Sequence, residues 1–144
     1  MNRRHFFRQV AALAALPLAG HTLTGCSRAA PVEVTWGESR CAVCNMVIAE
    51  KRFAAQIRDA AGAHHLFDDV GCAIRWLEDR ALAEDAVSFW VIDYKGGYWV
   101  DAFSAHYLSG KKSPMGYDLV ASTVPGEGDL AYAQARDRVL ARGR

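Results

Sequence analysis

A short segment near residue 40 concentrates sulfur donors. It reads Cys41-Ala-Val-Cys44-Asn-Met46 and places two thiols and one thioether within six residues. Sulfur ligands select soft ions such as Cu(I), because their polarizable lone pairs match these metals better than they match hard cations. Zn(II) prefers thiolate, imidazole or carboxylate, and a thioether is a poor ligand for it. The pattern therefore predicts a Cu(I) site built on Cys44 and Met46, with Cys41 as a further donor.

The two cysteines have two other possible uses. In an oxidising compartment, Cys41 and Cys44 can close a structural disulfide or act as a thioredoxin-like redox couple. A redox couple is expected at the start of a helix in a βαβ unit. Here the motif precedes the strand-like residues Val47 and Ile48. This context argues against the redox use and leaves the disulfide as an alternative to metal binding.

Further donors occur singly along the chain. A zinc ribbon would need a second Cys or Cys/His pair, but Cys72 is solitary and falls on the apolar face of an expected helix. We expect it to be a small buried residue, with a third thiol ligand or a disulfide bridge as alternatives. His64 and His65 alternate across an expected strand, so at most one faces a given site. His106 is closer in sequence to a second methionine motif.

That second motif is Ser113-Pro114-Met115-Gly116. Proline fixes one backbone dihedral and glycine frees another, which is typical of a turn that presents its side chains from a loop. We predict that Met115 is either a remote ligand or part of the wall of the metal site.

The elements that must position these residues follow from spacing and turn chemistry. Gly and Asp residues separate short apolar or aromatic segments, which indicates hairpins, and Asp68 or Asp69 can cap a helix whose apolar residues recur at three and four. No regular strand–helix alternation is present, so we expect an α+β fold: a small single domain of antiparallel β-hairpins with two helices. The expected elements are hairpins over 53–58/63–67 and 88–94/98–103, a helix through 72–77, a strand over 117–122 and a helix from Asp129 to Leu140.

The N-terminal segment has the pattern of an export signal. Arg3 and Arg4 precede an apolar run over 10–19, which is too short to span a bilayer comfortably. The paired arginines resemble a twin-arginine signal, with a general secretory signal as the alternative. Leu23-Thr24-Gly25-Cys26 resembles a lipobox, which predicts lipidation at Cys26; the alternative is a soluble secreted protein.

These boundaries divide the chain into an export signal (1–25), a lipidated Cys with a short tether (26–35) and a metal-binding domain (36–144). Removing residues 1–25 leaves 14 basic against 16 acidic residues. Nucleic-acid binding needs a basic excess gathered on one face, so no nucleic-acid partner is expected. The predicted location is the membrane surface facing the periplasm, with the lipid on Cys26 as the anchor.

Several of these motifs together resemble the NosL family. They are the lipobox, Cys-x-x-Cys-x-Met, the segment 67–72 (Phe-Asp-Asp-Val-Gly-Cys) and the late Ser-Pro-Met-Gly. Members are copper-binding lipoproteins that assist assembly of the copper centres of nitrous oxide reductase. The resemblance implies an α+β domain related to part of organomercurial lyase, and a protein that delivers Cu(I) rather than an enzyme. The implied partner is the copper enzyme apo-protein or its membrane-bound maturation complex.

Carried onto this chain, the resemblance assigns Cys44 and Met46 to the soft-donor motif, Cys41 to its first thiol and Met115 to the late loop. Asn45 departs from the glycine common in the family, but Asn tolerates a left-handed backbone better than most residues. Two rival functions remain, a thiol–disulfide oxidoreductase and an organomercurial-lyase-like enzyme. In the second, Asp68 or Asp69 would be the acid, although a helix cap is the simpler role for them.

Overall fold

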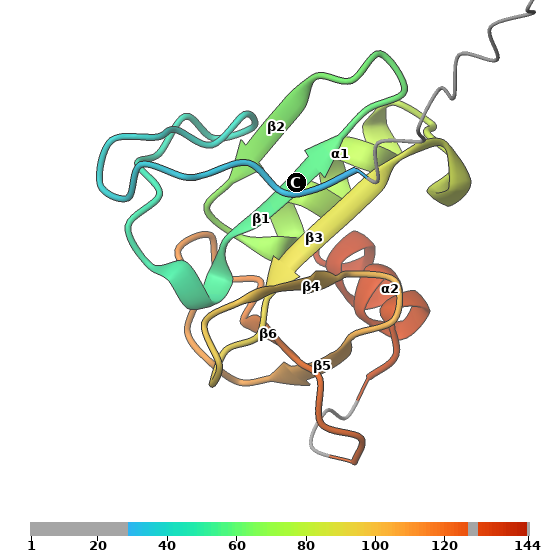
Figure 1. The fold of residues 1–144 in the computed structure, drawn as a ribbon. Helices are drawn as coiled ribbons and strands as arrows, with labels where there is room; N and C mark the ends of the chain where they lie inside the picture. The colour runs from blue at the N-terminus through green and yellow to red at the C-terminus, as the bar shows by residue number, and fades with distance from the viewer. Residues whose placement is uncertain (1–28, 127–129, 144) are drawn as a thin grey trace, which may run out of the picture.

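The structure is a computed structural model that describes residues 29–126 and 130–143. The predicted export signal and Cys26 lie outside these residues, so export and lipidation stay predictions. The chain forms two antiparallel sheets and two α-helices (Figure 1), which confirms the expected α+β class.

The larger sheet has four strands in the order β2-β1-β3-β4, with every neighbouring pair antiparallel. Both predicted hairpins are present. The first joins β1 (Ala55–Arg58) to β2 (His64–Phe67), and its turn includes Gly62 at a φ of 90°, a left-handed conformation that glycine adopts without strain. The second joins β3 (Ser88–Ile92) to β4 (Trp99–Asp101).

Helix α1 (Val70–Asp79) covers one face of this sheet. It begins where sequence spacing placed it, because the side chain of Asp69 accepts a hydrogen bond from the backbone of Gly71 at 2.9 Å and caps the helix. Apolar side chains of α1 and the sheet form the main core, which includes Ile57, Phe67, Phe89, Ile74 and Leu77. This core positions the start of α1 beside the end of β2.

The opposite face of the sheet is covered by the segment that enters the domain, which crosses the front of the sheet in Figure 1. Val34 is buried there with Ile48 and Ala54 in a second small core. The Gln56 side chain, fully buried in β1, accepts from the backbone N–H of Val32 at 2.9 Å and donates to its carbonyl at 3.1 Å. The described part of the predicted tether is therefore fastened to the domain rather than free of it.

A second sheet pairs β5 (His106–Ser109) with β6 (Leu119–Ser122), and α2 (Tyr132–Ala141) packs near it. Strand β6 was predicted and β5 was not. Asp129, the predicted first residue of the last helix, lies outside the described residues, but the N-cap is Ala131. The helix starts late because the backbone of Leu130 pairs with that of Tyr107, at 2.8 and 3.0 Å, which keeps Leu130 extended. Two short 3-10 turns, η1 (Lys51–Phe53) and η2 (Glu84–Ala86), complete the elements.

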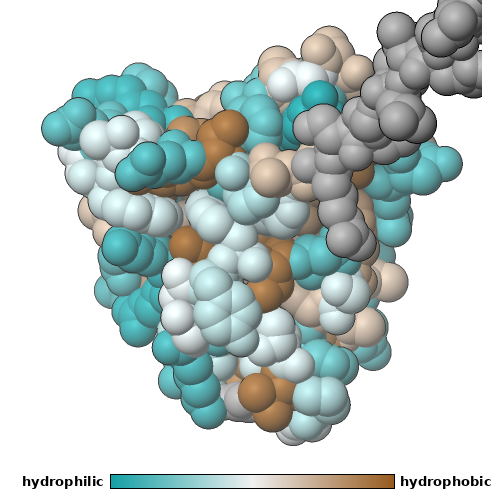
Figure 2. Space-filling model, in the orientation of Figure 1, coloured by the Kyte–Doolittle hydropathy of each residue, from teal (hydrophilic) through white to brown (hydrophobic). Residues whose placement is uncertain are grey.

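The face of the molecule in Figure 2 carries separate apolar patches among hydrophilic residues rather than one continuous apolar area. Within the part of the chain that the structure describes, no helix has the length and apolar character needed to cross a bilayer.

Candidate metal centre

The Cys-x-x-Cys-x-Met segment folds into a closed loop at the edge of the main core. The backbone N–H of Cys41 donates to the carbonyl of Met46 at 2.9 Å, and that of Asn45 donates to the carbonyl of Cys41 at 3.0 Å. Asn45 has a φ of 60°, so it adopts the left-handed conformation for which glycine would be the usual choice. A further bond from the N–H of Ala42 to the carbonyl of Leu66, 2.8 Å, fastens the loop to β2.

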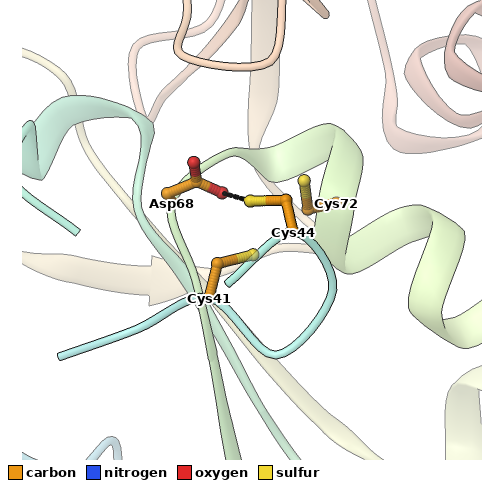
Figure 3. A group of neighbouring side chains, drawn as sticks. All are labelled: Cys41, Cys44, Asp68 and Cys72. Carbon is orange, nitrogen blue, oxygen red and sulfur yellow. Dashed lines mark hydrogen bonds between the residues drawn. The ribbon is translucent and has the colours of Figure 1, made fainter. Parts of the chain in front are cut away.

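This loop brings the predicted donors Cys41 and Cys44 close to two residues outside the loop, Asp68 and Cys72. The ligand atoms of Cys41, Cys44, Cys72 and Asp68 all lie within 4.8 Å of one another. Figure 3 shows that the cysteines of the loop, Asp68 after β2 and Cys72 at the start of α1 point toward one centre. All three cysteines are free. We call these four residues the thiol–carboxylate cluster.

Burial differs among the members of the thiol–carboxylate cluster. Cys41, Cys72 and Asp68 are buried, whereas Cys44 is partly exposed. Cys72 is a small buried residue on the apolar face of α1, as predicted, and it also supplies a third sulfur to the site. The cluster thus has a buried interior and reaches the surface at the partly exposed Cys44.

The three thiols of the cluster differ in pKa. The neighbouring Cys72 thiol donates a hydrogen bond to the sulfur of Cys41, which lowers the pKa of Cys41, and the same bond raises the pKa of Cys72. Burial raises the pKa of Cys44. Among the three thiols, that of Cys41 is therefore the one that loses its proton most readily. A thiophilic ion that binds here must displace the remaining thiol protons.

Asp68 is the member that sequence reasoning did not place in the site. Its Oδ1 accepts from the thiol of Cys44 at 3.3 Å, and its buried Oδ2 has no hydrogen-bond partner. Burial and the adjacent Cys41 thiolate raise the pKa of this carboxyl to about 6. A buried carboxylate oxygen without a partner is costly. Figure 3 shows that Oδ1 is the oxygen directed at the sulfur of Cys44, and that Oδ2 points away from it.

The neighbouring carboxylate, Asp69, ties the second methionine motif to the same place. Its Oδ2 accepts from the hydroxyl of Ser113 at 2.5 Å and from the backbone N–H of Met115 at 3.1 Å. Asp69 is fully buried, and its pKa is raised by that burial. The loop of Met115 is therefore held at the start of α1, directly beside the cluster.

Both predicted methionine donors are exposed. Met46 has 45% and Met115 has 41% of its surface accessible, so neither thioether is core filler. Their loops border the thiol–carboxylate cluster, one through Cys44 and the other through Asp69.

The histidines have other partners. His64 stacks on Trp90, with ring centroids 6.0 Å apart, and His65 pairs with Asp59 at 2.8 Å. His106 lies on β5 and is not part of the cluster among the described residues.

Asp68, which sequence reasoning missed as a site member, and Cys72, for which a third thiol ligand was only an alternative, occupy the boundary between β2 and α1. The available signal was position: the residue before an N-cap and the third residue of a helix lie near its positive end, where anions and thiolates are stabilised.

Comparisons with known proteins agree with this architecture. The family model described as NosL matches residues 31–128. The crystal structure of the copper chaperone NosL from Shewanella denitrificans superposes with a TM-score of 0.57 and 14% sequence identity, over 77% of this chain and 87% of that chain. At this identity the likeness shows the fold. No curated protein sequence matches the chain.

Proposed function

Because the chain belongs to the NosL family, we propose that it is a Cu(I)-binding lipoprotein of the cell envelope that delivers copper to a periplasmic enzyme, nitrous oxide reductase. In this proposal the protein is a carrier and Cu(I) is its cargo, so no catalysed reaction is assigned to it. The fold it shares with the copper chaperone from Shewanella denitrificans supports this role.

The observation that carries the proposal is the convergence of three thiols at a loop that also bears an exposed thioether. Soft sulfur donors suit Cu(I), and Cu(I) is satisfied by two or three of them. We assign Cys44 and Met46 as the principal ligands, assisted by Cys41 from the interior or by Met115 from the adjacent loop.

Partial exposure of the site suits transfer of the ion. Cys44 and Met46 are accessible, so a partner can offer its own donors while these two still hold the ion. A cavity of about 250 Å³, lined by Val43, Arg75, Asp79 and Tyr117, lies beside the loop and provides room for an incoming side chain. Ligand exchange then proceeds through a shared intermediate, and no free copper is released.

A lipid anchor and the export route complete the proposal. Lipidation at Cys26 would keep the carrier at the membrane, where the effective concentration of a membrane-bound partner is higher. From the twin-arginine pattern we propose that the chain is exported in a folded state.

Anaerobic reconstitution with Cu(I) tests the function. The parent protein should retain one Cu(I) per chain after desalting, and Cys44→Ser should largely abolish retention because a hydroxyl is a hard, protonated donor. Copper-loaded protein should then restore activity to copper-free nitrous oxide reductase, whereas the loaded Cys44→Ser preparation should not. Retention of copper by Cys44→Ser equal to that of the parent would contradict the assignment.

A further inference from the structure

We propose that the exposed side chains around the opening of the metal centre form a docking surface for an acidic protein segment, the one with which a copper-receiving partner presents its donors. The docking surface consists of three apolar and three cationic residues: Val43, Met46, Met115, Arg40, Lys111 and Lys112. This inference rests on the proposed copper function and adds to it the chemistry of the partner.

Two loops that are distant in the sequence build the docking surface together. The loop 41–46 carries Val43 and Met46, and the loop 113–117 carries Met115. Val43 and Tyr117 line the same cavity, so the two loops face each other across it. The opening between them is the place where Cys44 is partly exposed.

The apolar members are large side chains that the fold leaves uncovered. Val43 is 49%, Met46 45% and Met115 41% exposed. Apolar side chains that gather on a surface mark a place that another molecule covers. The cavity between the loops has a volume of about 250 Å³, which is below the roughly 300–1,000 Å³ of pockets for drug-sized ligands. It therefore suits a single apolar side chain of a partner.

Two lysines make the loop of Met115 positive. Lys111 and Lys112 are exposed, and within the described part of the chain neither has an ion-pair partner. The acidic residue that follows in this loop, Asp118, lies 3.8 Å from the guanidinium of Arg142 and accepts from the backbone of the loop itself. The positive charge of the two lysines is thus available to a partner.

The loop 41–46 has a cation at its start. The guanidinium of Arg40 donates to the carbonyl of Asn45 at 2.9 Å, which holds its charge against this loop. From residue 26 onward the chain has 14 basic against 16 acidic residues, so three cations at one opening do not follow from the composition. Complementary charge steers a partner to such a place, which indicates carboxylates on the partner.

A membrane surface is the alternative partner for a positive, partly apolar rim on an anchored protein. The cavity favours a protein segment, because it is concave and its lining includes the charged residues Arg75 and Asp79. Side chains that bind a bilayer instead project outward into the headgroup region. Phospholipids also lack the soft donors that would accept Cu(I).

The test measures the binding of labelled synthetic peptides to the full-length reduced chain, with Cys26→Ser in every sample to exclude lipidation. The acidic probe is Asp-Asp-Met-Leu-Met-Asp-Asp. The basic probe has lysine at each aspartate position, and the glycine probe has glycine in place of the leucine of the acidic probe. Fluorescence anisotropy gives their affinities for the metal-free and the Cu(I)-loaded protein, and vesicles of anionic phospholipid serve as the membrane probe.

Lys111→Ala/Lys112→Ala removes the charges of the Met115 loop. Ala60→Glu/Ala61→Glu is the matched control, because it changes the net charge by the same amount at the exposed turn between β1 and β2, at the opposite end of β2 from Asp68. Thermal melts of both variants confirm folding. Competition with a Cu(I) chelator shows whether their metal centre is intact.

At low ionic strength the parent should bind the acidic probe at least about tenfold more tightly than the basic probe, and added salt should reduce this difference. The lysine variant should bind the acidic probe about three- to tenfold more weakly, the effect of losing two exposed ion pairs, and the control less than about twofold. Cu(I) affinity should be the same in all three proteins. The glycine probe should bind more weakly than the acidic probe, because it leaves the cavity unfilled.

Equal affinities for the acidic and basic probes, or equal losses in the lysine variant and the control, would overturn the docking surface. A lysine variant that loses binding to the vesicles but not to the acidic probe would overturn it too, and would assign the rim to the membrane. The metal-free protein separates this inference from the copper function. If it binds the acidic probe as expected but retains no Cu(I), the copper function is wrong and the acidic docking surface stands.

Discussion

The hydroxyl of Ser113 donates to Oδ2 of Asp69 at 2.5 Å, across 44 residues of sequence. The same carboxylate caps α1 through the N–H of Gly71 and holds the N–H of Met115. One buried side chain therefore joins the start of the helix, which carries Cys72, to the loop that carries the second methionine. Loss of this carboxylate should affect both the fold and the metal site.

Asp69→Ala should lower the free energy of unfolding by about 2–3 kcal/mol, because it removes an N-cap and leaves the buried Ser113 hydroxyl and Met115 N–H without an acceptor. Chemical denaturation of the metal-free protein measures the loss. Asp101→Ala is the control, since Asp101 is exposed and accepts from the N–H of Ser104 in a comparable local turn. Equal losses in the two variants would show that the buried connections of Asp69 add nothing.

Gly71→Ala should destabilise the protein although Ala is the better helix former. A Cβ at this position would overlap the ring of Tyr117, and such overpacking costs about 1–3 kcal/mol. Replacing the ring in the double variant Gly71→Ala/Tyr117→Ser should recover part of the loss beyond the effect of Tyr117→Ser alone. Additive effects in this denaturation cycle would show that the close approach is not what requires glycine.

Met46→Leu should weaken Cu(I) binding, because it preserves volume and apolarity but deletes the sulfur. Since the side chain is 45% exposed, the unfolding free energy of the metal-free protein should change by less than about 1.5 kcal/mol. Competition with a Cu(I) chelator, beside thermal melts, separates the two effects. Met115→Leu serves as the comparison, and it should weaken binding less if Met46 is the principal thioether. Unchanged affinity in Met46→Leu would remove this residue from the site.

Much of the fold can be predicted from turn, cap and strand patterns within a few residues. The site cannot, because it depends on a contact between segments that are distant in the sequence. Gly62, the Asp69 cap and the aromatic strands around Gly97 each act within a few residues, so both hairpins and α1 are predictable. Strand β5 is short and is defined by its pairing with a distant β6. Cys72 and Asp68 become site residues only because the loop at Cys41 packs onto the end of β2.

The stability of the metal-free protein should depend on pH through Asp68. Its pKa is raised from 3.8 to about 6, so its favourable contribution is present below about pH 4 and is lost as the pH rises through 6. Asp68→Asn stays neutral throughout. The unfolding free energy of the parent minus that of Asp68→Asn should therefore fall between pH 4 and 7, by on the order of 1–3 kcal/mol.

The lowered pKa of Cys41 acts in the opposite direction, because its contribution is lost as the pH falls toward acid. The side chain of Asp68 contributes to this lowering, so the difference between the two proteins reports the linked ionisation of Asp68 and Cys41. Denaturation curves at several pH values under reducing, metal-free conditions measure the difference. A difference that does not vary with pH would mean that this carboxyl ionises alike in the folded and unfolded states.

Cys26→Ser should release the protein from membranes and leave the fold and Cu(I) binding intact, because Leu-Thr-Gly-Cys stands at the end of the predicted export signal and the clustered cysteines lie elsewhere. Cell fractionation followed by copper reconstitution checks both parts. Membrane association equal to that of the parent would rule out lipidation as the anchor.

With the proposed lipid anchor on Cys26, the two hydrogen bonds between Gln56 and Val32 would limit how far the metal loop can move from the bilayer. Val32 follows the proposed lipidated Cys26 by six positions, and a fully extended chain spans about 20 Å over that length. The domain would thus stay within a thin layer directly above the lipid headgroups. A recipient must present its copper-accepting donors within that layer, so reach as well as ligand chemistry would select the partner.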